Sequence, residues 1–123
     1  MSVRGVLLFG HGSRDPQWRE PMDQVARRIA EQSPGIPVAC AFLEMQAPDF
    51  GQAVTELVGA GATSITVLPM FLGIGKHVRE DLPALVAQVR ERHPGLTLHL
   101  LPSVGEQPEV LQGLADRVLT SSP

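Results

Sequence analysis

Short apolar runs alternate along the chain with longer segments in which apolar residues recur at helical spacing. The short runs are rich in Val, Ile and Leu and do not alternate strictly with polar residues, as expected of strands buried on both faces of a parallel sheet. They lie at Val6–Phe9, Val38–Leu43, Ile65–Leu68 and Leu96–Leu101. The pattern therefore predicts four strands of one parallel sheet.

The longer segments predict helices, because their apolar residues recur at positions i, i+3, i+4 and i+7 and form stripes that must cover apolar surface. The stripes consist of Trp18, Met22, Val25, Ala26 and Ile29; of Phe50, Ala53, Val54, Leu57 and Val58; of Val78, Leu82, Leu85, Val86 and Val89; and of Val110, Leu111, Leu114 and Val118. Proline favours the first turn of a helix, so helices are expected to begin near Pro16 and Pro108. Asp81-Leu82-Pro83 is expected to form an early helical turn.

The alternation of strands and helices predicts an α/β fold, because strand–helix–strand units of this length join parallel neighbours through right-handed connections. The simplest arrangement is a doubly wound four-stranded parallel sheet in the order 2-1-3-4, with helices on both faces. A chain of 123 residues is long enough for one such core and too short for two. We therefore expect a single domain over residues 1–123.

Composition narrows the possible functions. The 10 Lys and Arg against 13 Asp and Glu give a net charge of −3, whereas a nucleic-acid-binding protein needs a basic excess to neutralise phosphates. A single cysteine excludes an intramolecular disulfide and a zinc site built from cysteines. No apolar run approaches the roughly 20 residues that cross a bilayer. We expect a cytoplasmic protein that contacts neither nucleic acid nor membrane.

Two histidines and one glutamate follow three of the predicted strands. His11 comes directly after the first strand, Glu44 after the second, and the segment that ends at His77 after the third. Parallel strands end at one edge of the sheet, and ligands bind where the strand order reverses, so these side chains are expected to converge. His93 and His99 lie at the end of a helix and within the last strand, and neither is expected to reach this edge.

Glycines flank both histidines, at positions 10 and 12 and at positions 73 and 75. Backbone without side chains can turn tightly and approach a flat ligand. Neutral imidazole binds divalent iron, cobalt, nickel and zinc, and its pKa of about 6.5 also makes it a proton acceptor near neutrality. Taken alone, the spacing predicts a metal- or anion-binding α/β domain. Glu44 could equally be a helix cap or a solvated side chain.

Several segments closely resemble the class II chelatases, and in particular the small sirohydrochlorin chelatases of the cobalt chelatase type. They are Val6–Arg14, Phe42–Glu44, Pro69–His77 and Asp81–Pro83, and they match in order over nearly the whole chain. The resemblance implies insertion of a divalent metal ion (cobalt, iron or nickel) into a modified tetrapyrrole, as in cobalamin or sirohaem biosynthesis. The metal is then a substrate, and no organic cofactor is needed.

The resemblance also implies roles for single residues. The histidine that matches His11 binds the metal and accepts protons, and the one that matches His77 is a second metal ligand. The stretch that lines the tetrapyrrole matches Leu72, Gly73, Ile74, Gly75 and Lys76, and the further candidate substrate contacts are Ser13, Arg14 and Arg79. The three basic side chains among these would steer the carboxylates of the substrate. Small members of the family pair as homodimers, so a second copy of the chain is the expected partner.

Two positions depart from the family pattern. Some relatives carry a carboxylate just before the proline that matches Pro48, where it contacts substrate, but Ala47 stands here. Glu44 is therefore expected to take more of that role. A histidine-rich tract that some relatives have before the last strand is reduced here to a short link around His93.

Metal insertion releases two pyrrole protons, so one place must present the metal and remove the protons. We hypothesise that His77 and His11 hold the ion on one face of the macrocycle and that His11, once freed, acts as general base. Glu44 would orient His11 or relay its proton. One imidazole nitrogen cannot bind a metal and a proton together, so the two roles are sequential or divided.

Two alternative functions are open from the sequence. One is a non-catalytic carrier of tetrapyrrole or metal with the same fold. The other is phosphoryl transfer with His11 as nucleophile, because Gly10-His11-Gly12 resembles the Arg-His-Gly of histidine phosphatases. Gly10 stands where that chemistry needs an arginine to clamp the phosphate. A serine hydrolase is disfavoured further, because the chain has no Gly-x-Ser-x-Gly motif.

Overall fold

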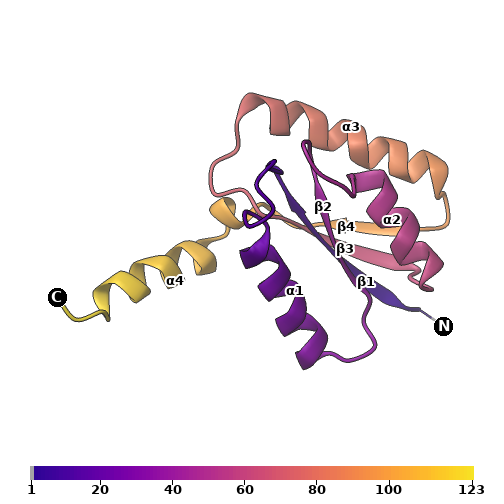
Figure 1. Cartoon of the computed structure of the whole chain (residues 1–123). Helices are drawn as coiled ribbons and strands as arrows, with labels where there is room; N and C mark the ends of the chain where they lie inside the picture. Colours follow the sequence, from indigo (N-terminus) through magenta and orange to yellow (C-terminus); the bar gives the residue numbers. More distant parts are fainter. Residues whose placement is uncertain (1) are drawn as a thin grey trace.

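The centre of the molecule is a four-stranded parallel sheet. The structure, a computed structural model, describes residues 2–123 and orders the strands β2-β1-β3-β4 (Figure 1). The strands are β1 Arg4–Gly10, β2 Val38–Phe42, β3 Ser64–Pro69 and β4 Thr97–Leu100, and all three pairings are parallel. The predicted fold class and strand order are confirmed.

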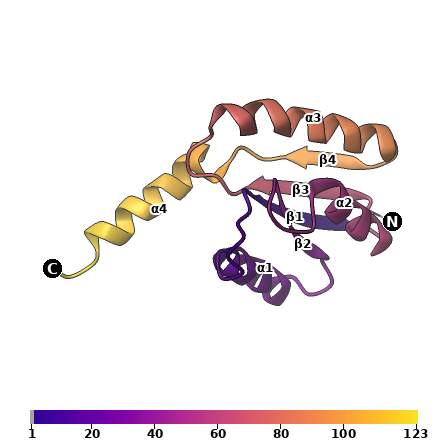
Figure 2. The same cartoon turned by 45° about the horizontal axis from the view of Figure 1, so that its top comes forward.

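Helices cover both faces of this sheet, as predicted. Alternate side chains of β1 point to opposite faces, so Leu7 and Phe9 pack with α2 and α3, while Val6 and Leu8 pack with α1. Figure 2 shows α3 on one side of the sheet and α1 on the other. The helices are α1 Glu20–Gln32, α2 Phe50–Gly59, α3 Lys76–Arg92 and α4 Pro108–Leu119, with a short 3₁₀ helix, η1, at Val104–Glu106.

The larger core lies between the sheet and the helices α2 and α3. The ring of Phe9 is fully buried and meets the rings of Phe50 and Phe71 edge to face, with centroid distances of 5.3 and 5.8 Å. Such pairs add stabilisation beyond the apolar area that they bury. Because Phe9 is the last residue but one of β1 and Phe71 follows β3, the cluster anchors the strand ends from which the candidate site is built.

Three sequence predictions about helices are corrected. Helix α1 begins at Glu20 with Pro21 in its first turn, not near Pro16, and Trp18 therefore lies in the preceding turn. Helix α3 begins at Lys76, so Pro83 lies inside the helix and not in an early turn. The predicted stripe of α4 is not buried: the helix contains no buried residue, and Val110 alone of the stripe is half-buried.

No helix in residues 2–123 is both long enough and apolar enough to cross a membrane. The single cysteine, Cys40 on β2, lies in the smaller core between the sheet and α1 and is 8% exposed. Burial raises the pKa of its thiol, because the thiolate would lose solvation, and the nearby Asp23 carboxylate raises it further. The group is therefore held as a neutral thiol at physiological pH.

We predict that Cys40 reacts slowly with thiol reagents in the folded chain. The thiolate is the nucleophile, so a raised pKa lowers the reactive fraction at pH 8, and burial blocks access, giving a rate at least about tenfold below that in urea. The rate of the folded chain should also keep rising at pH values where that of the unfolded chain has levelled off. Absorbance with an aromatic disulfide reagent measures both, and equal rates in buffer and urea would contradict the assignment.

Candidate functional site

The carboxyl ends of three neighbouring strands lie level with one another. Gly10 of β1 pairs with Phe42 of β2, and Phe9 pairs with Pro69 of β3. The connections that leave these strands therefore start at one edge of the sheet (Figure 1). This is the edge at which doubly wound folds bind ligands.

The pairing of β1 and β2 continues past the strands into their loops. The Leu43 N–H donates to the carbonyl oxygen of Gly10 (2.9 Å), and the Glu44 N–H donates to that of His11 (3.1 Å). Gly12 follows with a φ of 101°, and a Cβ at this position would collide with the carbonyl oxygen of Glu44. Only glycine combines this φ with so close an approach at little cost, so the two loops are held together by the backbone itself.

The two side chains brought together in this way form the centre of the candidate site. Nε2 of His11 lies 2.9 Å from Oε1 of Glu44, and each side chain is about half exposed, at 50% and 52%. A carboxylate at this distance fixes the orientation of the ring and favours the tautomer that carries its proton on Nε2. Nδ1 of His11 then presents a lone pair, which can bind a metal ion or accept a proton.

The loop after Glu44 turns back toward the β1 loop. Met45 adopts the left-handed region, with φ of 70°, which is uncommon for a residue other than glycine. The side-chain oxygen of Gln46 then accepts a hydrogen bond from the Ser13 N–H (3.0 Å). Gln46 is thus a second tie between the loops that carry His11 and Glu44. Sequence reasoning missed it, because a lone glutamine has no motif to mark it.

The structure does not join His77 to this pair. His77 is an exposed residue in the first turn of α3, and among residues 2–123 no three His, Cys, Asp or Glu side chains lie close enough together to hold one metal ion. His11 and Glu44 therefore form a contact of their own, with His77 on the neighbouring connection. His93 is half-buried at the end of α3 and His99 lies on β4, away from these loops as expected.

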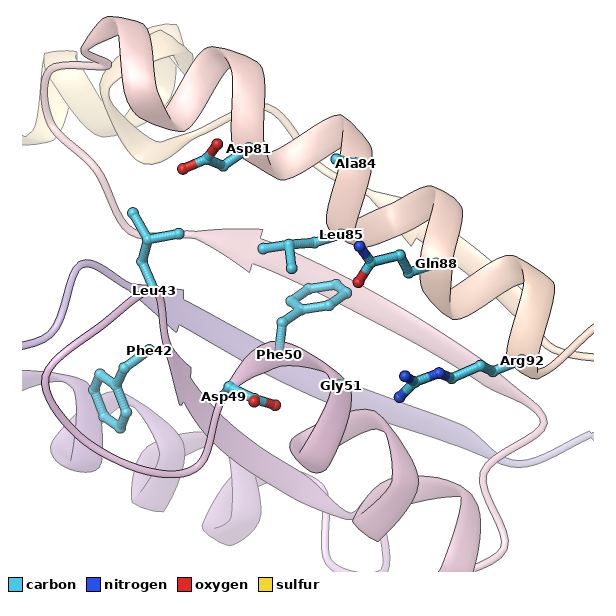
Figure 3. Close-up of a pocket in the computed structure, with 10 residues that line it drawn as sticks. All are labelled: Phe42, Leu43, Asp49, Phe50, Gly51, Asp81, Ala84, Leu85, Gln88 and Arg92. Carbon is cyan, nitrogen blue, oxygen red and sulfur yellow. The ribbon is translucent and has the colours of Figure 1, made fainter.

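One face of helix α3 lines a cavity of about 460 Å³, which is shown in Figure 3. Asp81, Leu85 and Gln88 point into this cavity from α3, opposite Leu43 and Phe50 from the β2 end and α2. His77 lies four residues before Asp81, one turn earlier on the same face. The cavity therefore lies against the face of α3 that begins with His77, and it is also lined by Leu43, which directly precedes Glu44.

The predicted substrate-lining residues occupy the connection from β3 to α3. Leu72 is 67% exposed, and Leu72 and Ile74 line a separate apolar groove on the other side of α3. Gly75 is the N-cap of α3 and offers no side chain to cap it, whereas Asp49 caps α2. The first-turn N–H groups of α3 are therefore available to an anion. Since Asp49 is the N-cap of α2, the alternative that Glu44 caps this helix is excluded.

The remaining candidates are exposed, except Ser13, which is half-buried. Nζ of Lys76 lies 3.9 Å from Oε1 of Glu80, which offsets part of its charge. Arg79 donates a hydrogen bond to the carbonyl oxygen of Ile74 (3.3 Å) and so closes the loop onto α3. The other exposed candidates are Arg14, Ala47 and Gly73.

A buried serine near the start of η1 holds the β3–α3 connection through hydrogen bonds to its backbone. The Ser103 hydroxyl accepts a hydrogen bond from the Phe71 N–H (3.2 Å) and donates to the Pro69 carbonyl oxygen (3.2 Å). The Gly105 N–H donates to the Phe71 carbonyl oxygen (3.1 Å), and a Cβ on Gly105 would collide with Leu72. The turn before α4 thus anchors the start of the loop that leads to His77. The sequence carries no recognisable signal for this contact.

Comparison with known proteins places this geometry in context. A family model described as CbiX matches residues 5–121. The sirohydrochlorin cobaltochelatase of Methanococcoides burtonii is 34% identical over 91 residues, which span 74% of this chain and 70% of that protein.

Solved structures agree with the sequence match. A CbiX protein of cobalamin biosynthesis from Marinobacter aquaeolei VT8 superposes with a TM-score of 0.79 at 30% identity, over 94% of both chains. The sirohydrochlorin chelatase SirB from Bacillus subtilis subspecies spizizenii, in complex with cobalt, gives 0.76 at 26% identity over 95% of this chain and 50% of SirB. SirB from Bacillus subtilis with Fe³⁺ gives 0.75 at 25% identity over 98% of this chain and 48% of that one.

We predict that Gly12→Ala destabilises the fold by about 1–3 kcal/mol, because it adds both a strained φ and a steric conflict with the Glu44 carbonyl. Gly73→Ala is the matched control at the same edge, since a Cβ there meets nothing within 4 Å and its φ is not in the left-handed region. Urea unfolding followed by circular dichroism measures both. Equal midpoints for the two variants would contradict the proposed backbone constraint.

Proposed function

The chain belongs to the CbiX family, and from this membership and the geometry of the strand ends we propose that it is a sirohydrochlorin chelatase. The observation that carries the proposal is the hydrogen-bonded pair of His11 and Glu44 on an open sheet edge. A flat macrocycle needs such an edge, because it cannot enter a closed core. The metal ion is a substrate of the reaction, and no organic cofactor takes part.

Cobalt, iron or nickel in the divalent state is the proposed metal. The relatives support the first two, since SirB structures contain cobalt or Fe³⁺, and imidazole binds all three ions. We propose that Nδ1 of His11 and the imidazole of His77 hold the ion in turn or together when substrate brings them to one place. Because no group of three His, Cys, Asp or Glu side chains forms within residues 2–123, coordination positions stay open for the pyrrole nitrogens.

His11 then serves as the general base. Two pyrrole N–H bonds break while the metal–nitrogen bonds form; Nδ1 of His11 accepts one proton once it no longer binds the metal, and water takes the other. The carboxylate of Glu44 stabilises the imidazolium that results, because it already accepts the Nε2 hydrogen bond. This division between the two ring nitrogens allows ligation and proton transfer to follow each other without movement of the Glu44 contact.

The carboxylates of the substrate are proposed to bind at the start of α3. The uncapped first turn of this helix attracts anions, and Lys76, Arg14 and Arg79 add positive charge near it. Ser13, Gly73 and Ala47 are exposed or half-exposed at the same edge and complete the proposed contact surface. Leu72 and Ile74 contribute through the groove that they line.

We also propose that the protein acts as a homodimer in the cytoplasm. The chain matches about half of SirB, so two copies would supply the two halves of such an enzyme. The exposed apolar residues of α4 support an interface with a second copy of the chain.

We predict that His11→Ala and His77→Ala each lower the rate of metal insertion by about 100-fold or more, since each removes a ligand or a base. The rate is followed by visible spectroscopy of sirohydrochlorin with Co²⁺, Fe²⁺ or Ni²⁺. His99→Ala is the matched control, because this histidine lies on β4 away from the site. Wild-type rates in both site variants would refute the assigned roles, and stoichiometric binding without faster insertion would indicate a carrier.

For Glu44→Gln we predict a fall in kcat of about tenfold, with little change in the KM for sirohydrochlorin. The amide can still hydrogen-bond to His11, but it no longer stabilises the imidazolium, so the loss appears in turnover and not in substrate binding. Glu56→Gln removes an equal charge from the exposed side of α2 and should leave both constants unchanged. A rise in KM alone would instead assign Glu44 to substrate contact.

A further inference from the structure

The hydrogen bond between Ser13 and Gln46 runs alongside the candidate site. Ser13 follows His11 by two residues on the loop after β1. Gln46 follows Glu44 by two residues on the loop after β2. The two residues are half-buried, and Oε1 of Gln46 accepts the Ser13 N–H at 3.0 Å. A group bound by the outer side of Gln46 would therefore be a neighbour of the candidate site.

The Ser13 N–H decides which way the amide of Gln46 points. A backbone N–H can only donate, so the amide atom that faces it must be the oxygen, and the amide NH₂ is directed away from Ser13. Within residues 2–123 this NH₂ group donates to no protein atom. The same part of the chain has no buried side-chain nitrogen or oxygen that lacks a partner. The NH₂ group of Gln46 is therefore open to solvent and free to donate.

Both loops that form this contact are closed by hydrogen bonds of their own. On the β1 side, Oγ of Ser13 accepts the Asp15 N–H (3.0 Å), and the Asp15 carboxylate accepts the Gln17 N–H (2.9 Å). On the β2 side, the Phe42 N–H donates to the Pro48 carbonyl oxygen (3.0 Å). The amide is thus held in place before a ligand arrives, which lowers the conformational entropy that binding costs.

We propose that the NH₂ group of Gln46 donates a hydrogen bond to a carboxylate at the periphery of the tetrapyrrole, an inference that rests on the proposed function. An NH₂ group can only donate, so its ligand must present an acceptor. The acceptors at the periphery of the proposed substrate are its carboxylates, since the pyrrole nitrogens bind the metal. Gln46 is then a substrate-binding residue on the β1–β2 side of His11.

The neutral charge of this donor suits its place beside the pair of His11 and Glu44. A cation two residues from Glu44 would compete for that carboxylate, and it would disfavour the positive charge that His11 gains when it accepts a proton. An amide binds a substrate carboxylate without adding charge. Lys76 and Arg79 therefore supply attraction at the start of α3, whereas Gln46 supplies direction.

The variant Gln46→Glu separates substrate binding from the tie between the loops. A carboxylate still accepts the Ser13 N–H, but its second oxygen replaces the NH₂ group and repels a substrate carboxylate. We expect the KM for sirohydrochlorin to rise by about tenfold or more, with a change in kcat below about twofold. Added salt should reduce the rise in KM, because salt screens exposed charges. A wild-type KM would overturn the proposal and leave Gln46 as a structural tie.

Gln24→Glu is the matched control for this variant. It makes the same change of side chain and net charge at an exposed position of α1. Both kinetic constants should keep their wild-type values. An equal rise in KM in Gln24→Glu would show a general effect of net charge on an anionic substrate, and it would overturn the assignment of Gln46.

Gln46→Leu tests the orientation of the amide without any substrate. Leucine keeps much of the side-chain volume but accepts no hydrogen bond. The Ser13 amide proton should therefore exchange with water about tenfold or more faster than in the wild type, while Gln46→Glu should keep the wild-type rate. Hydrogen exchange followed by NMR measures all three chains. Equal rates in Gln46→Leu and the wild type would overturn the orientation on which the proposal depends.

NMR can also observe the proposed hydrogen bond directly. The side-chain NH₂ signals of Gln46 in the isotope-labelled full chain are those that disappear from the spectrum of Gln46→Glu. Metal-free sirohydrochlorin should shift these signals and slow their exchange with water, while the signals of Gln24 stay in place. A shift without slower exchange would show proximity alone, and no shift in the saturated complex would show separation. Both outcomes overturn the proposal.

The wild-type chain separates failure of this proposal from failure of the proposed function. If the wild type neither binds sirohydrochlorin nor inserts metal, the proposed function fails and takes the inference with it. If the wild type inserts metal and Gln46→Glu keeps its KM, the role of Gln46 alone fails. Hydrogen exchange at Ser13 decides the orientation of the amide in both cases.

Discussion

The candidate site depends on the backbone contact between two loops. Hydrogen bonds from Leu43 to Gly10 and from Glu44 to His11 extend the β1–β2 pairing beyond the sheet, and Gly12 permits the close approach. The imidazole–carboxylate contact is a consequence of this register, because it places the two side chains next to each other whatever their own interaction contributes. A half-exposed pair would not persist through its charges alone, since water screens them. The sheet therefore supplies the precision, and the side chains supply the chemistry.

Sequence reasoning predicted what depends on local pattern. Buried runs such as Val6–Phe9 and helical stripes such as Phe50–Val58 gave the α/β class and strand order, and the topology placed His11 and Glu44 at one edge. Sequence reasoning missed two hydrogen bonds that depend on tertiary geometry, the one between Gln46 and Ser13 and the one between Ser103 and Phe71. Sequence reasoning also did not predict that α4 has no buried residue, because an apolar stripe shows that a helix needs a partner surface and not which molecule provides it.

The first turns of α3 lie between two hollows of the surface, the cavity of Figure 3 and the apolar groove on the other side of the helix. One face of this helix, with Asp81 and Leu85, lines the cavity of Figure 3, and another, with Val78 and Leu82, lines the apolar groove that also contains Leu72 and Ile74. Within residues 2–123 the first turn of α3 has no side-chain cap, and Lys76, His77 and Arg79 in this turn are exposed while Val78 is buried. His77 therefore lies on the solvent side of this turn, apart from His11 and Glu44.

The Ser103–Gly105 turn has a thermodynamic consequence. It is bonded to Phe71 at the start of the β3–α3 loop and continues into α4, so both elements share one rigid support. Binding equilibria coupled through such a support are reciprocal: if a molecule bound to α4 changed the affinity of the strand-end loops for a ligand, that ligand would change the affinity of α4 by the same factor. A ligand at the strand ends and a molecule on α4 would then change each other's affinity without touching.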